Sequence, residues 1–218
     1  APIFYDNQLL MFVCNIAHHA DIGGMSPGSM AGGMTEIYQE GLRIPPIRLF
    51  KSGKLMEDVM DMILLNVRVP EERRGDYNAQ IASNKLGIKR CLDLINKWGA
   101  KNIYEGFDVI IKSVAKRTRK SISNLPNGTY TFEDIVDDDG LSRKNIVLKV
   151  SIQVKKDQIL FDFSGTDPQV EGNNNVTMAG LQACCLYCIK VLLDPDCPQN
   201  HGMLDPVSII APEGTIVN

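Results

Sequence analysis

Two histidines and an aspartate lie within four consecutive positions, at His18, His19 and Asp21, and the glycines Gly23 and Gly24 follow them. Neutral imidazole nitrogens and carboxylate oxygens are ligands that Zn²⁺ or Mn²⁺ accepts in proteins. Glycines let the backbone turn sharply and let a ligand approach it closely. The chain contains only three histidines, so we expect its metal chemistry to centre on this segment. Because a catalytic zinc usually takes three protein ligands, the segment cannot close a metal site alone.

The elements next to this segment would position its side chains. Residues 9–16 are apolar enough for a buried strand, which would lead directly into the two histidines. If that strand continued unbroken, His19 and Asp21 would share one face and His18 would point to the other. Residues 25–33 consist mainly of Gly, Ser, Met and Pro without periodicity, and this composition predicts an ordered loop or a mobile flap.

The periodicity of the remaining chain predicts an α+β fold. Residues 1–54 would form the strand and loop of the metal site, residues 55–121 a helical segment, and residues 122–218 an antiparallel β-meander with a C-terminal apolar helix. Pro70 predicts the start of one long helix and Gly99 its end. The expected strands are residues 128–135, 145–154, 158–163 and 207–210, and the expected apolar helix is residues 176–193. The three segments would form one continuous fragment of a larger subunit.

Composition excludes several classes of function. A formal net charge of -3 and dispersed Lys and Arg residues do not indicate binding to nucleic acid or to a membrane surface. No apolar run approaches the roughly 20 residues that span a bilayer, and no secretory signal is recognisable, so a cytoplasmic location is expected. No phosphate loop, G-x-S-x-G or G-x-G-x-x-G motif occurs. An ATP site on this chain is therefore not expected.

The six cysteines are expected to be reduced thiols, because a chain of 218 residues with 44% hydrophobic content does not need disulfides to fold. Cys185 and Cys188 form a C-x-x-C pattern. Residues 184–189 are otherwise apolar, however, and this favours a buried helix in which cysteine acts as a small hydrophobic residue.

Several segments, in order along nearly the whole chain, resemble the hydantoinase B family. This family includes N-methylhydantoinase B, the C-terminal part of 5-oxoprolinase and a subunit of acetone and acetophenone carboxylases. The resemblance is carried by residues 18–24 (HHADIGG), 27–29 (PGS), 35–46 (TEIYQEGLRIPP), 66–68 (NVR), 75–76 (GD), 79–82 (AQIA), 162–166 (DFSGT) and 211–214 (APEG).

The resemblance implies an ATP-dependent opening of a cyclic amide such as hydantoin or 5-oxoproline. A hydantoinase A type partner subunit or domain would bind ATP and phosphorylate the substrate, forming a hetero-oligomer with this chain. A zinc or manganese ion would polarise the activated carbonyl or supply hydroxide. The alternatives are ATP-dependent carboxylation of a ketone on the same scaffold, and a truncated piece that serves only in assembly.

The resemblance also implies roles for individual residues. His18 maps to the coordinating histidine, so the metal-site candidates are His18 and His19, and the other ligands are expected upstream of residue 1. His19 and Asp21 would orient the ligand as outer residues. The chain starts without methionine and ends in a turn-rich stretch, so we expect a fragment that is inactive by itself. Asp21 and Arg43 are the catalytic candidates.

Arg43, which stands near two prolines, has two interpretations. Its planar guanidinium could bind a substrate carboxylate or phosphate in a bidentate way, or it could form a buried ion pair with Glu36 or Glu40. His201 is expected in a loop. Asn66 and Arg68 could face the same cleft as Arg43, but capping and surface pairing explain them as well. Residues 164–166 could form a nucleophile turn, but no base is identifiable and their composition favours a simple loop.

Overall fold

The computed structural model describes residues 1–218 and confirms the α+β class. By its internal contacts the chain divides into two compact units, residues 1–103 and residues 104–218, which we call unit 1 and unit 2. The three-segment division expected from periodicity stays a prediction. Helix α3, Ala100–Ile122, contains the boundary between the units.

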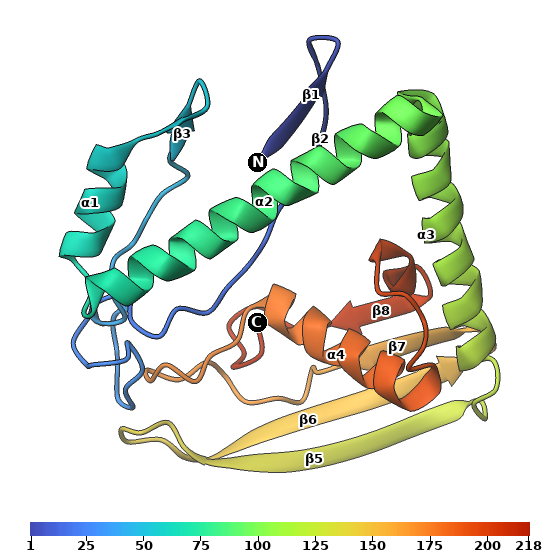
Figure 1. The fold of residues 1–218 in the computed structure, drawn as a ribbon. Coiled ribbons are helices and arrows are strands. Elements are labelled where there is room, and N and C mark those ends of the chain that lie inside the picture. Colours follow the sequence, from blue (N-terminus) through green and yellow to red (C-terminus); the bar gives the residue numbers. More distant parts are fainter. The chain divides into compact units, whose positions relative to one another are not determined.

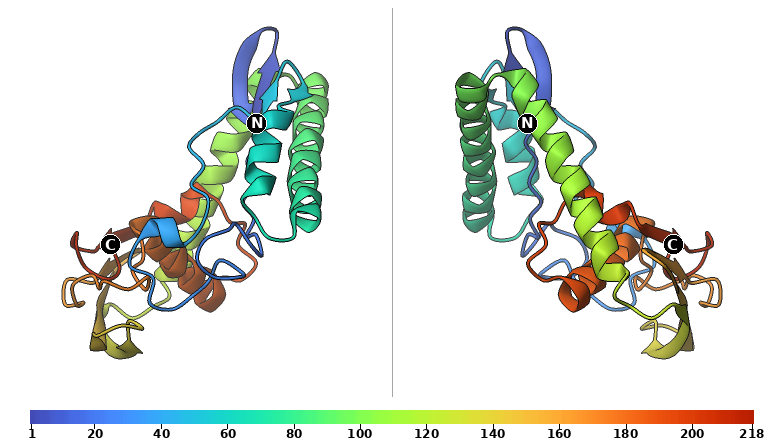
Figure 2. Two further views of the ribbon diagram at one scale, coloured as in Figure 1. Left: turned by 90° about the vertical axis from the view of Figure 1, so that its left-hand side faces the viewer. Right: turned by 90° about the vertical axis from the view of Figure 1, so that its right-hand side faces the viewer.

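Unit 1 begins with a hairpin of two short strands, β1 (Pro2–Tyr5) and β2 (Gln8–Phe12). Figures 1 and 2 show this hairpin alongside α2, and Ile3 of β1 is completely buried. The other elements of unit 1 are a 3-10 turn η1 (Ile37–Gln39), strands β3 (Phe50–Lys51) and β4 (Lys54–Leu55), and helices α1 (Glu57–Leu65) and α2 (Pro70–Trp98).

The expected buried strand over residues 9–16 is wrong in extent and in burial. Strand β2 ends at Phe12, and Phe12 and Leu9 are 63% and 48% exposed. Residues 13–19, which include both neighbouring histidines, belong to neither a helix nor a strand. A two-residue turn at Asp6 and Asn7, both with positive φ, closes the hairpin and fixes its short register. The histidines therefore do not follow a strand, and tertiary contacts must position them.

Helix α2 begins at Pro70 and ends at Trp98, as the sequence predicts. The fixed φ of proline suits the first helical turn, and Glu71 and Glu72 complement the positive end of the helix dipole there. Gly99 ends the helix with φ of 79°. A small apolar cluster of Met60, Leu64 and Val67, with Tyr77 and Ile81 packed against it, joins the start of α2 to α1.

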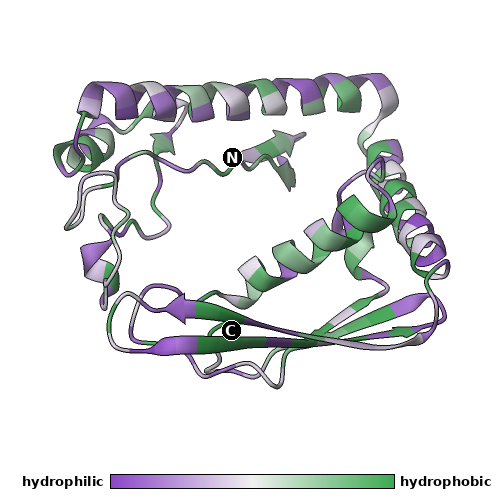
Figure 3. Cartoon of the chain, turned by 90° about the horizontal axis from the view of Figure 1, so that it is seen from below, coloured by the Kyte–Doolittle hydropathy of each residue, from purple (hydrophilic) through white to green (hydrophobic).

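Unit 2 contains a four-stranded sheet in the order β5-β6-β7-β8. Its antiparallel part confirms the expected meander, and β8 adds a parallel edge beside β7. Residues of the strands and of α4 form one apolar core, and Figure 3 colours α4 largely hydrophobic while α2 alternates between hydrophilic and hydrophobic turns. The bounds are β5 (Gly128–Asp138), β6 (Lys144–Lys155), β7 (Gln158–Asp162), α4 (Met178–Leu193), η2 (His201–Leu204) and β8 (Val207–Ile210).

The cysteine-rich part of α4 is buried on one face only. Cys185 and Ile189 lie in the core, whereas Cys184, Tyr187 and Cys188 are exposed, which corrects the prediction of a fully buried run. Burial raises the pKa of the Cys185 thiol to about 11. All six cysteines are free thiols.

None of the helices combines the length and the apolar character that crossing a bilayer requires.

Candidate functional site

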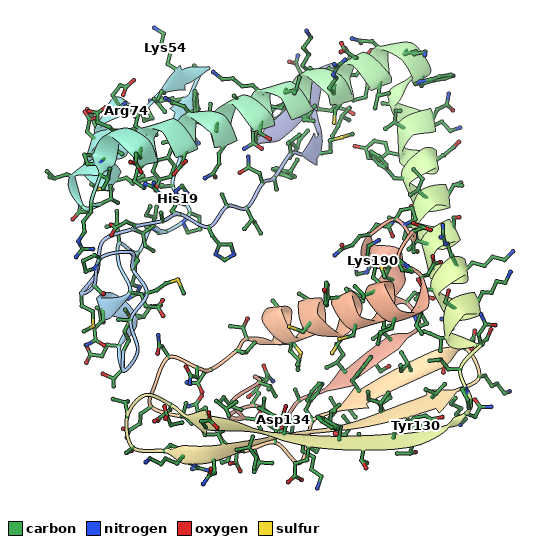
Figure 4. All side chains as sticks on the ribbon, turned by 60° about the horizontal axis from the view of Figure 1, so that its bottom comes forward. His19, Lys54, Arg74, Tyr130, Asp134 and Lys190 are labelled. Atoms are coloured by element: carbon green, nitrogen blue, oxygen red, sulfur yellow. The ribbon has the colours of Figure 1, made fainter.

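The histidine segment lies in unit 1 against the first half of α2, as Figure 4 shows for His19. A cavity of about 430 Å³ opens at this place. Both neighbouring histidines line it, together with residues from one face of the helix. The lining residues are Ala17, His18, His19, Ala20, Arg73, Asp76, Ala79 and Gln80. The structure therefore brings the predicted metal-site histidines to a concave surface.

His19 is held tightly by α2. Its ring stacks on Tyr77 with 4.6 Å between the ring centroids, and its Nε2 lies 2.8 Å from the side-chain nitrogen of Gln80. Its Nδ1 is buried without a hydrogen-bond partner and lies 4.0 Å from a carboxylate oxygen of Asp76. Only 12% of the side chain is exposed. One ring nitrogen of His19 is thus already engaged within the protein.

His18 differs from its neighbour in every one of these respects. Its side chain is exposed and makes no hydrogen bond, ion pair or ring contact within the chain. The two ring nitrogens of a neutral histidine are one donor and one lone-pair acceptor. Because neither nitrogen of His18 is used internally, its lone pair is available to a ligand in the cavity.

Arg73 supplies a buried positive charge beneath the cavity. Only 7% of its side chain is exposed, and it forms ion pairs with Glu72 at 3.2 Å and with Asp76 at 3.0 Å. Asp76 in turn is the carboxylate nearest to His19. The groups along this wall are therefore, in order, the Arg73 guanidinium, the Asp76 carboxylate and the His19 imidazole, and the guanidinium neutralises the carboxylate from one side.

Asp21 is buried and accepts four hydrogen bonds, two at each carboxylate oxygen. The backbone N–H groups of Gly23 and Arg68 donate to Oδ1 at 2.9 Å, and Gly28 N and Arg68 Nη1 donate to Oδ2 at 3.0 and 2.9 Å. The backbone N–H of Arg68 makes the largest contribution to holding the pKa of this carboxyl well below its usual range. Asp21 is therefore ionised and fully hydrogen-bonded, an arrangement that favours positioning of the loop.

Arg68 completes this arrangement from the other side of the loop. Besides its bonds to Asp21, the guanidinium donates to the carbonyl oxygens of Gly23, Gly24 and Ser26 at 3.4, 3.0 and 3.0 Å. Five donors in a planar fork suit such a set of converging oxygens. The side chain of Arg68 is thus a clamp for residues 21–28, beyond the surface pairing expected from the sequence.

Glycines allow two backbone segments to pack against each other here. A Cβ atom at Gly24 would collide with backbone atoms of Gln39 and Glu40, and one at Gly41 would collide with Ile22. Gly24 has φ of 83° and Gly41 φ of 148°, so both backbones lie in the region that favours glycine. Residues 22–25 are consequently bound to residues 39–42 through paired backbone hydrogen bonds.

Arg43 lies on a second cavity of unit 1, of about 630 Å³. Its guanidinium stands 5.0 Å from the centre of the Tyr38 ring, a cation–π distance. The expected alternative of a buried ion pair is wrong, because Arg43 is exposed and contacts neither Glu36 nor Glu40 through a salt bridge. The cavity is lined by Gly24, Tyr38, Gly41, Leu42, Arg43, Ile44, Pro45 and Asn66.

The contacts of Asn66 and Ser164 and the location of His201 indicate structural roles. Asn66 ends α1 and donates from its side chain to the Met62 carbonyl oxygen at 2.7 Å. Ser164 turns the chain after β7 by bonding to Asp162 at 2.5 Å, as a simple loop does. His201 is exposed at the start of η2.

Sequence reasoning assigned no role to the helix residues that form the wall of the histidine cavity, although Asp76 and Gln80 lie in two of the segments that carry the resemblance. Arg73, Asp76 and Gln80 lie three to four positions apart, so they share one face of α2. This spacing of a cation, an anion and an amide was the available signal. The pairing of Arg68 with Asp21 gave no such signal, because Asp21 lies 47 residues earlier in the chain.

A family model described as hydantoinase B/oxoprolinase matches residues 1–218. The chain is 32% identical to the B-type subunit of a putative D-/L-hydantoinase from Pseudomonas sp. (strain NS671), over 100% of this chain and 39% of that relative. It is also 32% identical to 5-oxoprolinase 1 of Arabidopsis thaliana, over 100% of this chain and 19% of the relative. The chain therefore spans about two fifths of the first relative and one fifth of the second.

Solved structures agree with this match. The ATP-dependent caprolactamase from Pseudomonas jessenii superposes with a TM-score of 0.87 at 26% identity, over 100% of this chain and 38% of that chain. A nucleotide-free acetone carboxylase superposes with a TM-score of 0.86 over 100% of this chain and 30% of that chain, and at 18% identity this shows a shared fold alone. From the family match over all its residues, the chain belongs to the hydantoinase B/oxoprolinase family.

Proposed function

We propose that the chain contributes one part of the catalytic centre of an ATP-dependent cyclic amidase, which opens hydantoin, 5-oxoproline or a related lactam. The names of its relatives, a hydantoinase, a 5-oxoprolinase and a caprolactamase, support this reaction class. Within the chain, one observation carries the proposal. His18 is exposed without any partner on the wall of a cavity, directly beside a histidine that the protein holds in place.

A divalent metal fits His18 better than His19. His18 has both ring nitrogens free, whereas the Nε2 of His19 is engaged by Gln80 and its Nδ1 faces a carboxylate that Arg73 already neutralises. Residues 1–218 contain no group of three or more His, Cys, Asp or Glu side chains that could hold a metal ion. His18 would therefore supply one ligand, and His19 would orient the segment that carries it. Further ligands would come from outside these residues.

A bound zinc or manganese ion would supply Lewis acidity and lower the pKa of water toward neutrality. The residues of this chain would bind and orient. Asp21 and Arg68 hold the loop of residues 21–28 in one conformation, so Asp21 acts on the site through positioning. Pre-organisation of this kind avoids the entropic cost of ordering the loop during the reaction.

Arg43 would bind an anionic group of the substrate. Its guanidinium faces a cavity of about 630 Å³, a volume within the usual range for small-molecule sites. Stacking on Tyr38 fixes the plane of the guanidinium without using its N–H donors. A carboxylate or a phosphoryl group could then accept two parallel hydrogen bonds from it.

The ATP-dependent step would take place on a hydantoinase A type partner, in a cytoplasmic hetero-oligomer. Two relatives are named as single subunits of larger enzymes, a hydantoinase and a caprolactamase, and this supports the presence of a partner. Phosphorylation of the amide oxygen by the partner would weaken amide resonance and make the carbonyl carbon electrophilic. The present residues alone would then show no turnover.

The test is His18→Gln in the full-length protein assembled with its partner. Metal content measured by elemental mass spectrometry should fall from stoichiometric to about a tenth or less, because the lone pair is lost. His201→Gln, at another exposed histidine, is the matched control and should retain the metal. His19→Gln should weaken metal affinity by about 10–100-fold, as expected for a residue that orients a ligand. An unchanged metal content in His18→Gln would reject the ligand assignment.

ATP turnover distinguishes the reaction classes that share this scaffold. Stimulation by hydantoins, 5-oxoproline or caprolactam supports ring opening. Stimulation by acetone with bicarbonate would replace it by ketone carboxylation. A complete complex that binds neither metal nor any of these substrates would assign the chain to assembly alone.

A further inference from the structure

Three side chains within about one and a half turns of α2 surround the ring of His19. Asp76, Tyr77 and Gln80 share this face of the helix, and all three approach the same imidazole. Tyr77 stacks on the ring, and burial raises the pKa of its phenol. The amide of Gln80 lies at one ring nitrogen, and the carboxylate of Asp76 lies on the side of the other.

These contacts select one tautomer of the neutral ring. The side-chain nitrogen of Gln80 lies 2.8 Å from His19 Nε2, and an amide NH₂ group can only donate. Nε2 then accepts with its lone pair, and the ring proton is on Nδ1. The nearest carboxylate oxygen, from Asp76, lies 4.0 Å from Nδ1, which is too long for a hydrogen bond but favours a proton over a lone pair at this nitrogen.

The opposite tautomer conflicts with the surroundings. Exchanging the oxygen and nitrogen of the Gln80 amide would let Nε2–H donate, but Nδ1 would then present a buried lone pair toward the Asp76 carboxylate. Two facing acceptors repel each other, and no donor is available to Nδ1. Asp76 cannot turn away freely, because Arg73 holds it at 3.0 Å with a guanidinium that is itself buried.

We propose that Gln80 is a positioning residue that holds His19 as the neutral Nδ1–H tautomer and so anchors residues 17–20 to α2. The lone pair of His19 Nε2 is committed to the Gln80 amide. His18, the adjacent residue on the anchored segment, keeps its own lone pair for the cavity. Gln80 thereby determines which of two neighbouring histidines is presented to a ligand.

The consequence for metal binding rests on the proposed function, but the tautomer of His19 does not. If His18 is the ligand, loss of Gln80 should loosen the segment and weaken metal affinity by about 10–100-fold, without removing any ligand atom. In the metal-free chain the tautomer alone is measurable.

The experiment is a long-range ¹H–¹⁵N NMR spectrum of the imidazole nitrogens in the uniformly labelled, metal-free 218-residue chain. The spectrum is recorded at about pH 8.5, which is above the ordinary histidine pKa of about 6.5. Assignment needs only His18→Gln and His201→Gln, because the chain has three histidines. In the wild type, His19 should show a protonated Nδ1 and an unprotonated Nε2, while His18 and His201 average between tautomers.

Two variants at the same position test the role of the amide. In Gln80→Glu the carboxylate can only accept a hydrogen bond, so His19 Nε2 should carry a proton, in contrast to the wild type. In Gln80→Ala the signals of the two ring nitrogens should average as in a free histidine. Asn78→Ala, on an exposed position of the same helix, is the matched control and should leave the spectrum unchanged.

A wild-type His19 with its proton on Nε2 would overturn the proposal, even if a variant failed to fold. A spectrum that is identical in wild type and in folded Gln80→Ala would also overturn it. Failure of the proposed function looks different: His19 would keep the Nδ1–H tautomer in the metal-free chain, while His18→Gln would retain its metal in the full-length protein.

Discussion

Unit 1 and unit 2 are each stabilised internally by a different kind of interaction. In unit 2, apolar side chains of the sheet and α4, such as Ile146, Phe161 and Ile189, form a continuous buried core. The histidine segment and the loop of residues 21–28 in unit 1 depend instead on Asp21, on Arg68 and on close backbone packing at glycines. The buried apolar cluster of unit 1, at the start of α2, is small.

The difference indicates a division of tasks. An apolar core tolerates small displacements because burial is not directional, so it is suited to support. Hydrogen bonds to a buried carboxylate are directional, so they fix individual atoms at a site. The geometry of the candidate site therefore depends on individual hydrogen bonds, whereas the stability of the sheet depends on buried apolar volume.

Phe161→Ala should have the largest effect, and it tests the apolar side of the comparison. Removing a ring that is 6% exposed should reduce the free energy of unfolding by about 4 kcal/mol, from lost burial and the cavity left behind. Hydrogen exchange measured by mass spectrometry should accelerate in β6 and β7. Phe132→Ala, at a phenylalanine that is 66% exposed on β5, should cost less than about 1 kcal/mol. Equal losses in the two variants would contradict a core that is held by burial.

Asp21→Asn should have the second-largest effect. It should reduce the free energy of unfolding of unit 1 by about 3 kcal/mol. Its amide NH₂ would face Arg68 or a backbone donor, and the guanidinium would lose its anionic partner. Hydrogen exchange should accelerate in residues 21–28 and at Arg68, with β6 and β7 unchanged. Asp58→Asn, at an exposed carboxylate in the first turn of α1, is the control and should lower the free energy of unfolding by less than about 1 kcal/mol through the helix dipole. Faster exchange in the sheet would show that the polar loop is not a local structure.

Gly24→Ala should cost about 2 kcal/mol through strain and collision with the backbone of Gln39 and Glu40. Gly53→Ala provides the matched comparison, because Gly53 has nearly the same φ, 77° against 83°, but no atom within 4 Å of the added Cβ. It should cost only about 1 kcal/mol from the left-handed backbone. Denaturant unfolding measures both. Identical losses would mean that close packing at Gly24 contributes nothing.

Lowering the pH should produce the smallest loss of stability, and this loss should depend on the charge of Asp21. Its folded-state pKa lies below the ordinary value of about 3.9, so its contribution to stability is complete above that pH and declines as the pH falls further. The stability advantage of wild type over Asp21→Asn should therefore be constant between pH 7 and 5 and shrink from about pH 4 to pH 2. Unfolding curves across this range test it. A difference that is independent of pH would show that the carboxylate charge is not what the loop requires.

Local patterns determined much of this molecule. Pro70 and Gly99 bound a long helix because they act on the backbone next to them, whatever lies elsewhere in the chain. Period-two alternation predicted β5, β6 and β7, since each strand of an amphipathic sheet repeats the same burial pattern. The pair of histidines was identified as a candidate site from residue type alone, and Arg43 was identified as a side chain that could face a ligand.

Tertiary structure decided how those candidates differ. The resemblance assigned the ligand role to His18, but the physical difference between His18 and His19 comes from Gln80, which lies 61 residues later in the chain. Asp21 becomes a buried loop anchor only through Arg68, and the strand expected before the histidines ends at Phe12, opposite Pro2, where its pairing with β1 stops. Sequence sets the local backbone and the available chemistry. Which nitrogen or oxygen stays free depends on partners that only the folded chain brings within hydrogen-bond distance.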